Sequence, residues 1–188
     1  MTSGLEFMAT VLLGLLALGL VAYLVTLYNS LIQVWNNIGK AWGNIDVLLL
    51  QRNDEIAKLI DLSRAYVSYE ADSLDALTRL RMRYRAVKGT ARKTTTENAI
   101  GASMRGLTRV WEGYPDLKAN EPFLQIQERV SALEDAIADR RAFFNETVQI
   151  YNVQRERIPQ VLVAALAFRT HPYLDLPPLA ASMPGPRV

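Results

Sequence analysis

The sequence predicts an all-α protein, with an N-terminal transmembrane helix followed by a long helical bundle of three to four helices. Three observations predict this class. No charged residue occurs from Phe7 to Gly39. Beyond that run, apolar residues recur at alternating spacings of three and four, which is the pattern of amphipathic helices. No stretch shows the two-residue alternation that is typical of a half-buried strand.

Residues 8–27, MATVLLGLLALGLVAYLVTL, are the expected membrane-spanning segment, and residues 1–7 precede it as a short N-terminal tail. A helix needs about 20 mostly apolar residues to cross the hydrocarbon core of a bilayer. The alternative is a cleaved signal peptide, which usually has a basic start and an apolar core of roughly 7–15 residues. Here the only charged side chain before the run is Glu6. We therefore expect an uncleaved single-pass anchor in the cell membrane.

The charges beside the span indicate its orientation. Glu6 precedes the span, whereas three basic residues follow it: Lys40, Arg52 and Lys58. The positive-inside rule then favours a soluble domain that faces the cytoplasm. The chain contains no cysteine, which excludes disulfides, and its net charge of +2 indicates no class of partner.

Residues 28–170 form the expected bundle. Its first apolar seam, from Leu31 to Leu77, stays in phase across Arg52, so one very long helix is possible. The letters RND at residues 52–54 are equally compatible with a tight turn. We expect the turn, because Asp54 fits the N-cap of a new helix.

Two further helices follow. After Gly89, Thr94 and Glu97 fit a capping box, which opens a shorter helix that ends near Gly113. The stretch YPDLKANEPFLQ at residues 114–125 then connects this helix to the next. Within it a proline prevents helix continuation, an asparagine is a good N-cap and a second proline suits a first helical turn: Pro115, Asn120 and Pro122.

The last long helix is expected at residues 123–157, and Pro159 ends or kinks it. VLVAALAF, directly beyond, can form one more short apolar helix. Residues 171–188 are rich in proline and are expected to be a disordered tail.

Polar residues in phase with the apolar seams form the main candidate site. We interpret them as interhelical ion pairs and hydrogen bonds that fix the register of the bundle, as buried polar groups can do. The alternative is a ligand or divalent-cation site, which requires carboxylates without an arginine partner. The members of this polar network are Arg52, Tyr66, Glu70, Arg81, Glu134, Arg141, Asn145 and Asn152.

The residue inventory argues against an enzyme. His171 is the only histidine, so neither a His pair nor a Cys cluster can bind a transition metal. The sequence contains no Gly-rich phosphate loop and no Gly-x-Ser-x-Gly motif. We expect no catalytic residue, no cofactor and no metal site, and we expect His171 to be a solvated residue of the tail.

Several separated motifs resemble the LemA family and occur in the family's order. They are YNSLIQVWNNIGKAWGNIDVLLLQRNDEI, then YPDLKANEPFLQIQ, then EDAIADRRAFFNETVQIYN and Pro159. The resemblance implies an antiparallel helical bundle behind a single-pass anchor, with no settled biochemical activity. The chain departs from the family pattern near the expected turn, where it has Gln51, Ala57 and Lys58.

The function class that we expect is a membrane-anchored interaction or scaffold protein that self-associates or recruits other membrane proteins, with no nucleic-acid partner. Leu48, Leu49 and Leu50 favour this class, because three consecutive residues cannot all face one core. The alternative class is a ligand- or cation-responsive membrane component that uses the polar network.

A basic run from Arg79 to Lys93 contains no acidic residue. It is either a solvated helix end that complements the helix dipole or a contact for anionic lipid. The lipid contact depends on a chain that turns back near Arg52. Its candidate residues are Arg83, Arg85, Lys88 and Arg92.

Overall fold

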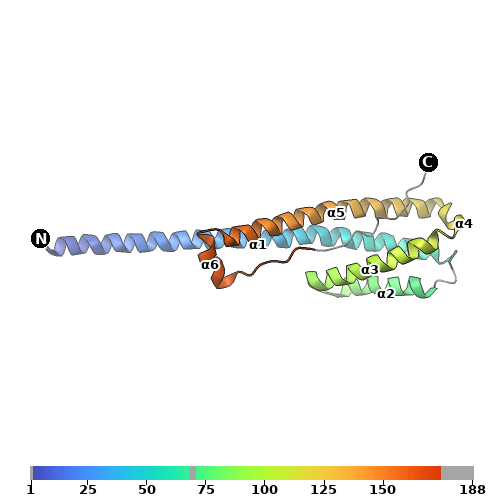
Figure 1. Cartoon of the computed structure of the whole chain (residues 1–188), viewed down its shortest axis with the longest axis horizontal. Helices are drawn as coiled ribbons and strands as arrows, with labels where there is room; N and C mark the ends of the chain where they lie inside the picture. The colour runs from blue at the N-terminus through green and yellow to red at the C-terminus, as the bar shows by residue number, and fades with distance from the viewer. Residues whose placement is uncertain (1, 68–70, 175–188) are drawn as a thin grey trace. The chain divides into compact units, whose positions relative to one another are not determined.

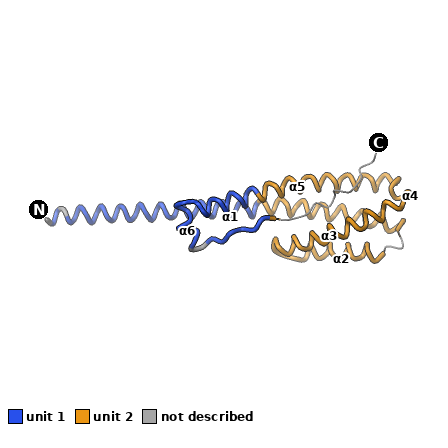
Figure 2. The backbone as a smooth tube through the Cα atoms, viewed as in Figure 1, with its two compact units in different colours: residues 1–40, 146–173 blue, residues 41–145, 174–188 orange. Residues whose placement is uncertain are grey.

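The computed structural model describes residues 2–67 and 71–174 of the chain, and within them the secondary structure is entirely helical (Figure 1). The helices are α1 (Thr2–Ser63), α2 (Ala71–Ala86), α3 (Thr90–Trp111), α4 (Pro115–Lys118), α5 (Glu121–Glu156) and α6 (Gln160–Ala167). They form two compact units, which Figure 2 colours separately. Unit 1 comprises residues 1–40 and 146–173, and unit 2 comprises residues 41–145 and 174–188.

Unit 2 is an antiparallel bundle. α2 returns along α1, because Arg64 pairs with Asp75 at 2.8 Å while Tyr84 donates a hydrogen bond to Asp46 at 2.7 Å. α3 lies beside α2 (Figure 1). α5 also runs opposite to α1, because the ring of Phe144 contacts Trp42 near the start of this unit. The buried seam residues of these four helices form a continuous apolar core: Ile45, Leu49, Ile56, Leu74, Leu77, Ile100, Met104, Leu107, Val130 and Ile137.

The connection from α3 to α5 packs tightly onto this core. α4 is a single turn whose Leu117 is fully buried. The ring centroids of Trp111 and Phe123, on either side of it, are 5.3 Å apart. The Asn120 side chain accepts a hydrogen bond from the backbone N–H of Phe123 at 3.0 Å, which confirms the predicted N-cap.

Unit 1 combines the N-terminal part of α1, the end of α5 and α6. The Gln154 amide donates to the Ser30 hydroxyl at 2.8 Å, and the Trp35 ring contacts the Tyr151 ring at a centroid distance of 5.4 Å. After α6 the chain runs back along α5, where the backbone carbonyl of Phe168 accepts a hydrogen bond from Arg155 at 3.0 Å. The predicted short helix after Pro159 is confirmed as α6.

The predicted turn at residues 52–54 is wrong. α1 begins at Thr2, within the predicted N-terminal tail, and continues through Arg52 to Ser63. The seam stays in phase across Arg52, and Arg81 of α2 donates to the backbone carbonyl of Asn53, so α2 packs along an unbroken α1 at this position. Asp54 does not cap a helix, since its carboxylate pairs with Arg85 of α2.

The predicted capping box at Thr94 is also wrong. α3 begins four residues earlier, at Thr90, and the Thr94 hydroxyl donates to the backbone carbonyl of Thr90 at 2.9 Å. The residue that precedes α3 is Gly89, with a φ of 90°. Glycine adopts this left-handed conformation without the steric cost that a side chain would bring, so it sets where the chain reverses into α3.

The tail predicted to be disordered from residue 171 begins as a fixed segment. The backbone N–H of His171 donates to the Asn152 side chain at 3.0 Å, and the backbone N–H of Leu174 donates to the Asn145 side chain at 2.8 Å. The rest of the predicted tail, residues 175–188, lies outside the described residues.

Candidate functional site

Each of three long helices in unit 2 places one charged residue on its buried seam. On α1, Arg52 lies between Leu49 and Ile56, at spacings of three and four. On α3, Glu97 lies three residues before the buried Ile100. On α5, Glu134 follows the buried Val130 by four residues. Side chains at these spacings share one helix face, so all three charges point into the bundle.

The three charges form one buried ion network. Nη2 of Arg52 contacts Oε1 of Glu97, and Nη1 of Arg52 contacts Oε1 of Glu134. The side chains of Arg52, Glu97 and Glu134 are only 3%, 4% and 10% exposed. A guanidinium carries its donors in a rigid planar fork, so one arginine can hold carboxylates from two helices at once. The network therefore ties α1, α3 and α5 together at one level.

Burial lowers the pKa of Arg52, because desolvation disfavours the charged form, and the neighbouring Glu134 carboxylate opposes this effect. Arg141, one helical repeat beyond Glu134 on α5, is half-buried and also lowers the pKa of Arg52 as a like charge. The four residues carry two positive and two negative charges. The interior of the bundle is thus close to electrically neutral at this level.

Asp46 forms the centre of a second polar cluster in unit 2. Both of its carboxylate oxygens accept hydrogen bonds from Nζ of Lys93 at 2.6 Å, and Oδ1 also accepts one from the hydroxyl of Tyr84 at 2.7 Å. The Lys93 ammonium lies 5.2 Å from the centroid of the Tyr84 ring, within the range of a cation–π contact. Burial and the hydrogen bond to Asp46 raise the pKa of the Tyr84 phenol.

Arg81 reaches α1 in another way. Its Nε donates to the backbone carbonyl of Asn53 at 2.7 Å, and burial lowers its pKa, with the like charge of Arg85 adding to the effect. The Asn53 side chain is fully buried. Neither of its polar atoms has a hydrogen-bond partner among the residues that the structure describes.

Asn145 and Asn152 hold the segment that follows α6 instead of a facing helix. Asn145 accepts from the backbone N–H of Leu174 and donates to its carbonyl at 3.2 Å, within unit 2. Asn152 makes the same pair of bonds with His171 in unit 1, its amide donating to the carbonyl at 3.0 Å. A side-chain amide has one donor group and one acceptor, which match the carbonyl and the N–H of one backbone residue. Asparagine can therefore hold a non-helical segment by two hydrogen bonds.

His171 is a half-buried part of unit 1 and not the solvated residue that we expected. Its ring packs edge-on against Trp35 at a centroid distance of 5.4 Å. Tyr151, beneath the same tryptophan, donates its hydroxyl hydrogen to the backbone carbonyl of Arg169 at 2.9 Å. Burial raises the pKa of Tyr151.

The remaining predicted residues whose positions are described lie apart from the ion network. Tyr66 is partly exposed and accepts a hydrogen bond from the Asn120 amide at 3.3 Å, while Glu70 lies outside the described residues. The four basic residues of the predicted lipid contact are all exposed, and Arg85 among them pairs with Asp54. Two of these four also line a small hollow of about 200 Å³ between α2 and α3: Arg83 and Arg92.

Sequence reasoning missed Glu97, Asp46, Tyr84 and Lys93 as members of the polar interior. For Glu97 the signal was available, because residues 97, 100, 104, 107 and 111 repeat the three-and-four spacing of the buried face of α3. Among the described residues no group of three or more acidic, histidine or cysteine side chains gathers to hold a metal ion. Both carboxylates of the ion network already contact Arg52.

These features define a class: an all-α protein with a long apolar N-terminal helix that packs against further helices in an antiparallel bundle with a charged interior. The family model of the LemA family matches residues 41–187. The chain belongs to the LemA family, as its separated motifs predict. Comparison with the curated proteins finds no match.

Proposed function

We propose that the chain is a membrane-anchored scaffold that self-associates, or recruits other membrane proteins, through its helices at the membrane surface. The observation that carries this proposal is an exposed apolar patch on α5 in unit 1. Ile150 and Val153 are 52% and 41% exposed and lie three residues apart on one helix face. They line a hollow of about 440 Å³ whose other residues are polar: Glu146, Gln149, Gln154, Arg157 and Gln160.

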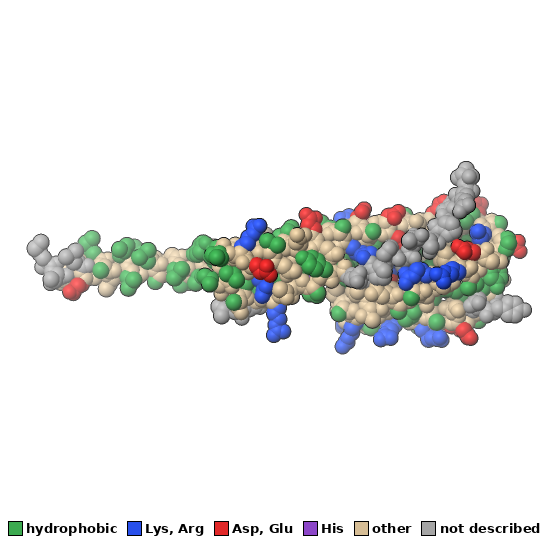
Figure 3. All heavy atoms as spheres, in the orientation of Figure 1, with side chains coloured by type: hydrophobic (Ala, Val, Ile, Leu, Met, Phe, Trp, Pro, Cys, Tyr) green, Lys and Arg blue, Asp and Glu red, His purple; other side chains and the backbone are tan. Residues whose placement is uncertain are grey.

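The anchor itself is supported by the exposure of α1. Within the described part of the chain, one helix is long and apolar enough to cross a membrane, and none of its most apolar window is buried. Most of the side chains exposed on this stretch are hydrophobic (Figure 3). Exposed apolar surface on this scale marks contact with lipid or protein.

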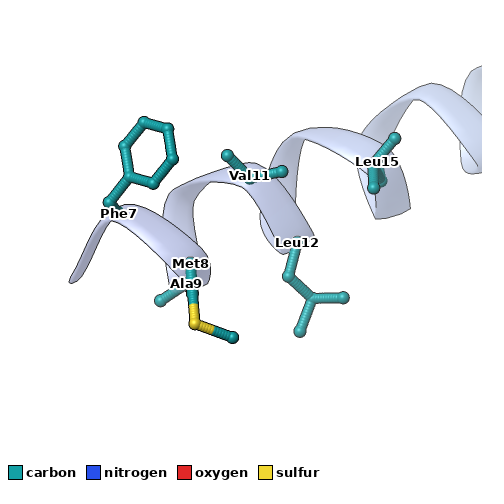
Figure 4. A pocket seen from close by; sticks show the side chains of 6 residues that line it. All are labelled: Phe7, Met8, Ala9, Val11, Leu12 and Leu15. Carbon is teal, nitrogen blue, oxygen red and sulfur yellow. The ribbon is translucent and has the colours of Figure 1, made fainter. Parts of the chain in front are cut away.

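Figure 4 shows the apolar surface near the N-terminus from close by. Its hollow of about 510 Å³ is lined entirely by one stretch of α1: Phe7, Met8, Ala9, Val11, Leu12 and Leu15. A surface formed by one isolated helix has no opposite wall to bind a small molecule. Lipid acyl chains around a single-pass span account for it, and the charges beside the span favour a bundle that faces the cytoplasm.

The patch on α5 suits a helical partner, and we expect this partner to be a second copy of the chain. An apolar stripe with a polar rim is the usual form of a helix-to-helix contact. In a twofold dimer the same patch serves both protomers, so a single stripe is sufficient. The leucine triplet supports this less than we expected, because Leu49 is buried and Leu48 and Leu50 are half-buried.

The test is the mass of the intact particle in a mild detergent, measured by native mass spectrometry on the full chain. We expect a dimer or larger particle, which Ile150→Glu combined with Val153→Glu reduces to a monomer. Met82→Glu is the matched control, because Met82 is an exposed apolar residue on α2, at 66%, and lies outside the patch. A parent chain that is a monomer with nothing bound would refute the scaffold.

A further inference from the structure

The face of α6 that points away from unit 1 is apolar. Val161, Leu162 and Ala165 lie at spacings of one, three and four residues on α6 and are exposed, and Ile158, in the turn before the helix, is exposed as well. Ile158 and Leu162 are 85% and 68% exposed. Ala164, on another side of the helix, is buried. α6 is therefore an apolar helix, and its exposed stripe has no cover among the described residues of its own unit.

Contacts inside unit 1 place α6 at the end of the expected membrane span. The ring of Phe168, directly after α6, lies 5.5 Å from the ring of Tyr28, the first residue beyond the segment 8–27. The end of α5 is fixed at the same level by the hydrogen bond from Gln154 to Ser30. In Figure 2 the free N-terminal part of α1 extends past α6 within this unit.

The side chains around this level have the composition of a membrane interface. Tyr23 and Tyr28 are 51% and 42% exposed on α1, and tyrosines are enriched where a span meets the headgroups. Two arginines beside α6 are exposed, Arg157 and Arg169. Glu156, four residues before α6, lies 3.9 Å from the guanidinium of Arg155. A short apolar stripe flanked by basic residues is typical of a helix that lies in the interfacial plane.

We infer that α6 is a second membrane contact, which inserts its apolar face into the headgroup and acyl boundary of the bilayer that α1 crosses. This inference rests on the proposed anchor, because only a bilayer that ends near Tyr28 brings lipid to α6. An isolated single span can rotate and tilt freely. A side-by-side contact through α6 fixes the rotation of unit 1 about the span and so determines which face of α5 points along the membrane.

The absence of cysteine from the chain allows a single-label test. Full-length Leu162→Cys carries an environment-sensitive fluorophore in vesicles of phosphatidylcholine and phosphatidylglycerol, with lipids brominated either near the headgroup or near the chain end as quenchers. We expect blue-shifted emission that is quenched more by the shallow bromines than by the deep ones. An interfacial helix buries its apolar face only about 5–10 Å into the boundary.

Two further label positions make the result specific. Leu16→Cys, in the middle of the span, should be quenched more by the deep bromines. Asn37→Cys, an exposed position on α1, lies about 14 Å beyond Tyr28 at 1.5 Å per residue and should be quenched by neither. Quenching at Leu16 without quenching at Leu162 overturns the role of α6 and leaves the anchor standing. Loss of quenching at Leu16 instead overturns the anchor on which the proposed function depends.

A second label position, alone and with an added charge, distinguishes lipid from a protein surface as the partner that covers α6. Ile158→Cys should show the same shallow quenching as Leu162→Cys, and adding Leu162→Asp should abolish most of it by placing a charge in the apolar stripe. Blue-shifted emission that no brominated lipid quenches would mean that a protein surface covers α6, and it would overturn the inference.

Discussion

Replacing Arg52 removes the shared partner of two buried carboxylates, which makes it the sharpest test of the ion network. In Arg52→Met, Glu97 and Glu134 remain at 4% and 10% exposure without the guanidinium that both contact. Breaking a buried ion pair by removing one partner costs about 3–5 kcal/mol in the free energy of unfolding. For a chain of this size that loss lowers Tm by on the order of 10 °C.

A triple variant isolates the electrostatic part of this loss. Arg52→Met combined with Glu97→Met and Glu134→Met replaces the whole network by apolar side chains of similar length. Such replacements of complete buried networks are often neutral or stabilising, because neither carboxylate remains without the guanidinium that it contacted. We therefore expect the triple variant to recover most of the stability that the single variant loses.

The measurement is thermal and urea unfolding of the full chain in one mild detergent, followed by circular dichroism and by tryptophan fluorescence. A single variant that loses less than about 1 kcal/mol, or a triple variant as unstable as the single one, would refute the buried-network reasoning.

Three other outcomes follow from the structure. A variant that begins at Tyr28 should unfold cooperatively on heating, since the side chains described between residues 7 and 26 are exposed and add nothing to the core; a broad, noncooperative melt would contradict this. Folding raises the pKa of Tyr84, so the stability that the protonated phenol contributes is intact below about pH 10 and declines above it by roughly 1.4 kcal/mol per pH unit. Tyr84→Phe should therefore flatten the alkaline fall in the free energy of unfolding. Equal slopes for the parent and the variant would argue against this. The lipid contact depended on a turn near Arg52, and α1 continues through Arg52 to Ser63, so that condition is not met. We therefore expect glutamine at the four basic positions to leave sedimentation of the Tyr28 variant with anionic liposomes unchanged, as for a solvated helix end; reduced sedimentation would contradict this. These four positions are Arg83, Arg85, Lys88 and Arg92.

Apolar periodicity was sufficient to predict the helices of this chain, because a seam with spacings of three and four depends on local geometry alone. It could not decide between a turn and a continuous helix at residues 52–54. The deciding contacts come from residues about 30 positions away, where Arg85 pairs with Asp54 and Arg81 donates to the carbonyl of Asn53. Those polar side chains are used between helices, so they are not available as caps.

The candidate site was predicted in part for the same reason. The phase of the seams identified Arg52 and Glu134, whose side chains are in contact. Glu97 was assigned to a local capping box instead, although it lies on the seam of α3 and contacts Arg52. Asn145 and Asn152 were predicted to pair between helices, and this kind of partner is wrong. Their partners are backbone groups of the segment after α6, whose extended course leaves no periodic signal in a proline-containing sequence.

The position of the charges on the seams explains why a bundle would retain them at the cost of desolvation. Apolar side chains pack almost equally well when two helices shift by one turn, because their contacts are not directional. A shift of about 5.4 Å would instead move Glu134 away from Arg52 and leave both charges buried without a partner. Glu97 applies the same restriction to α3, so one arginine fixes the register of three helices.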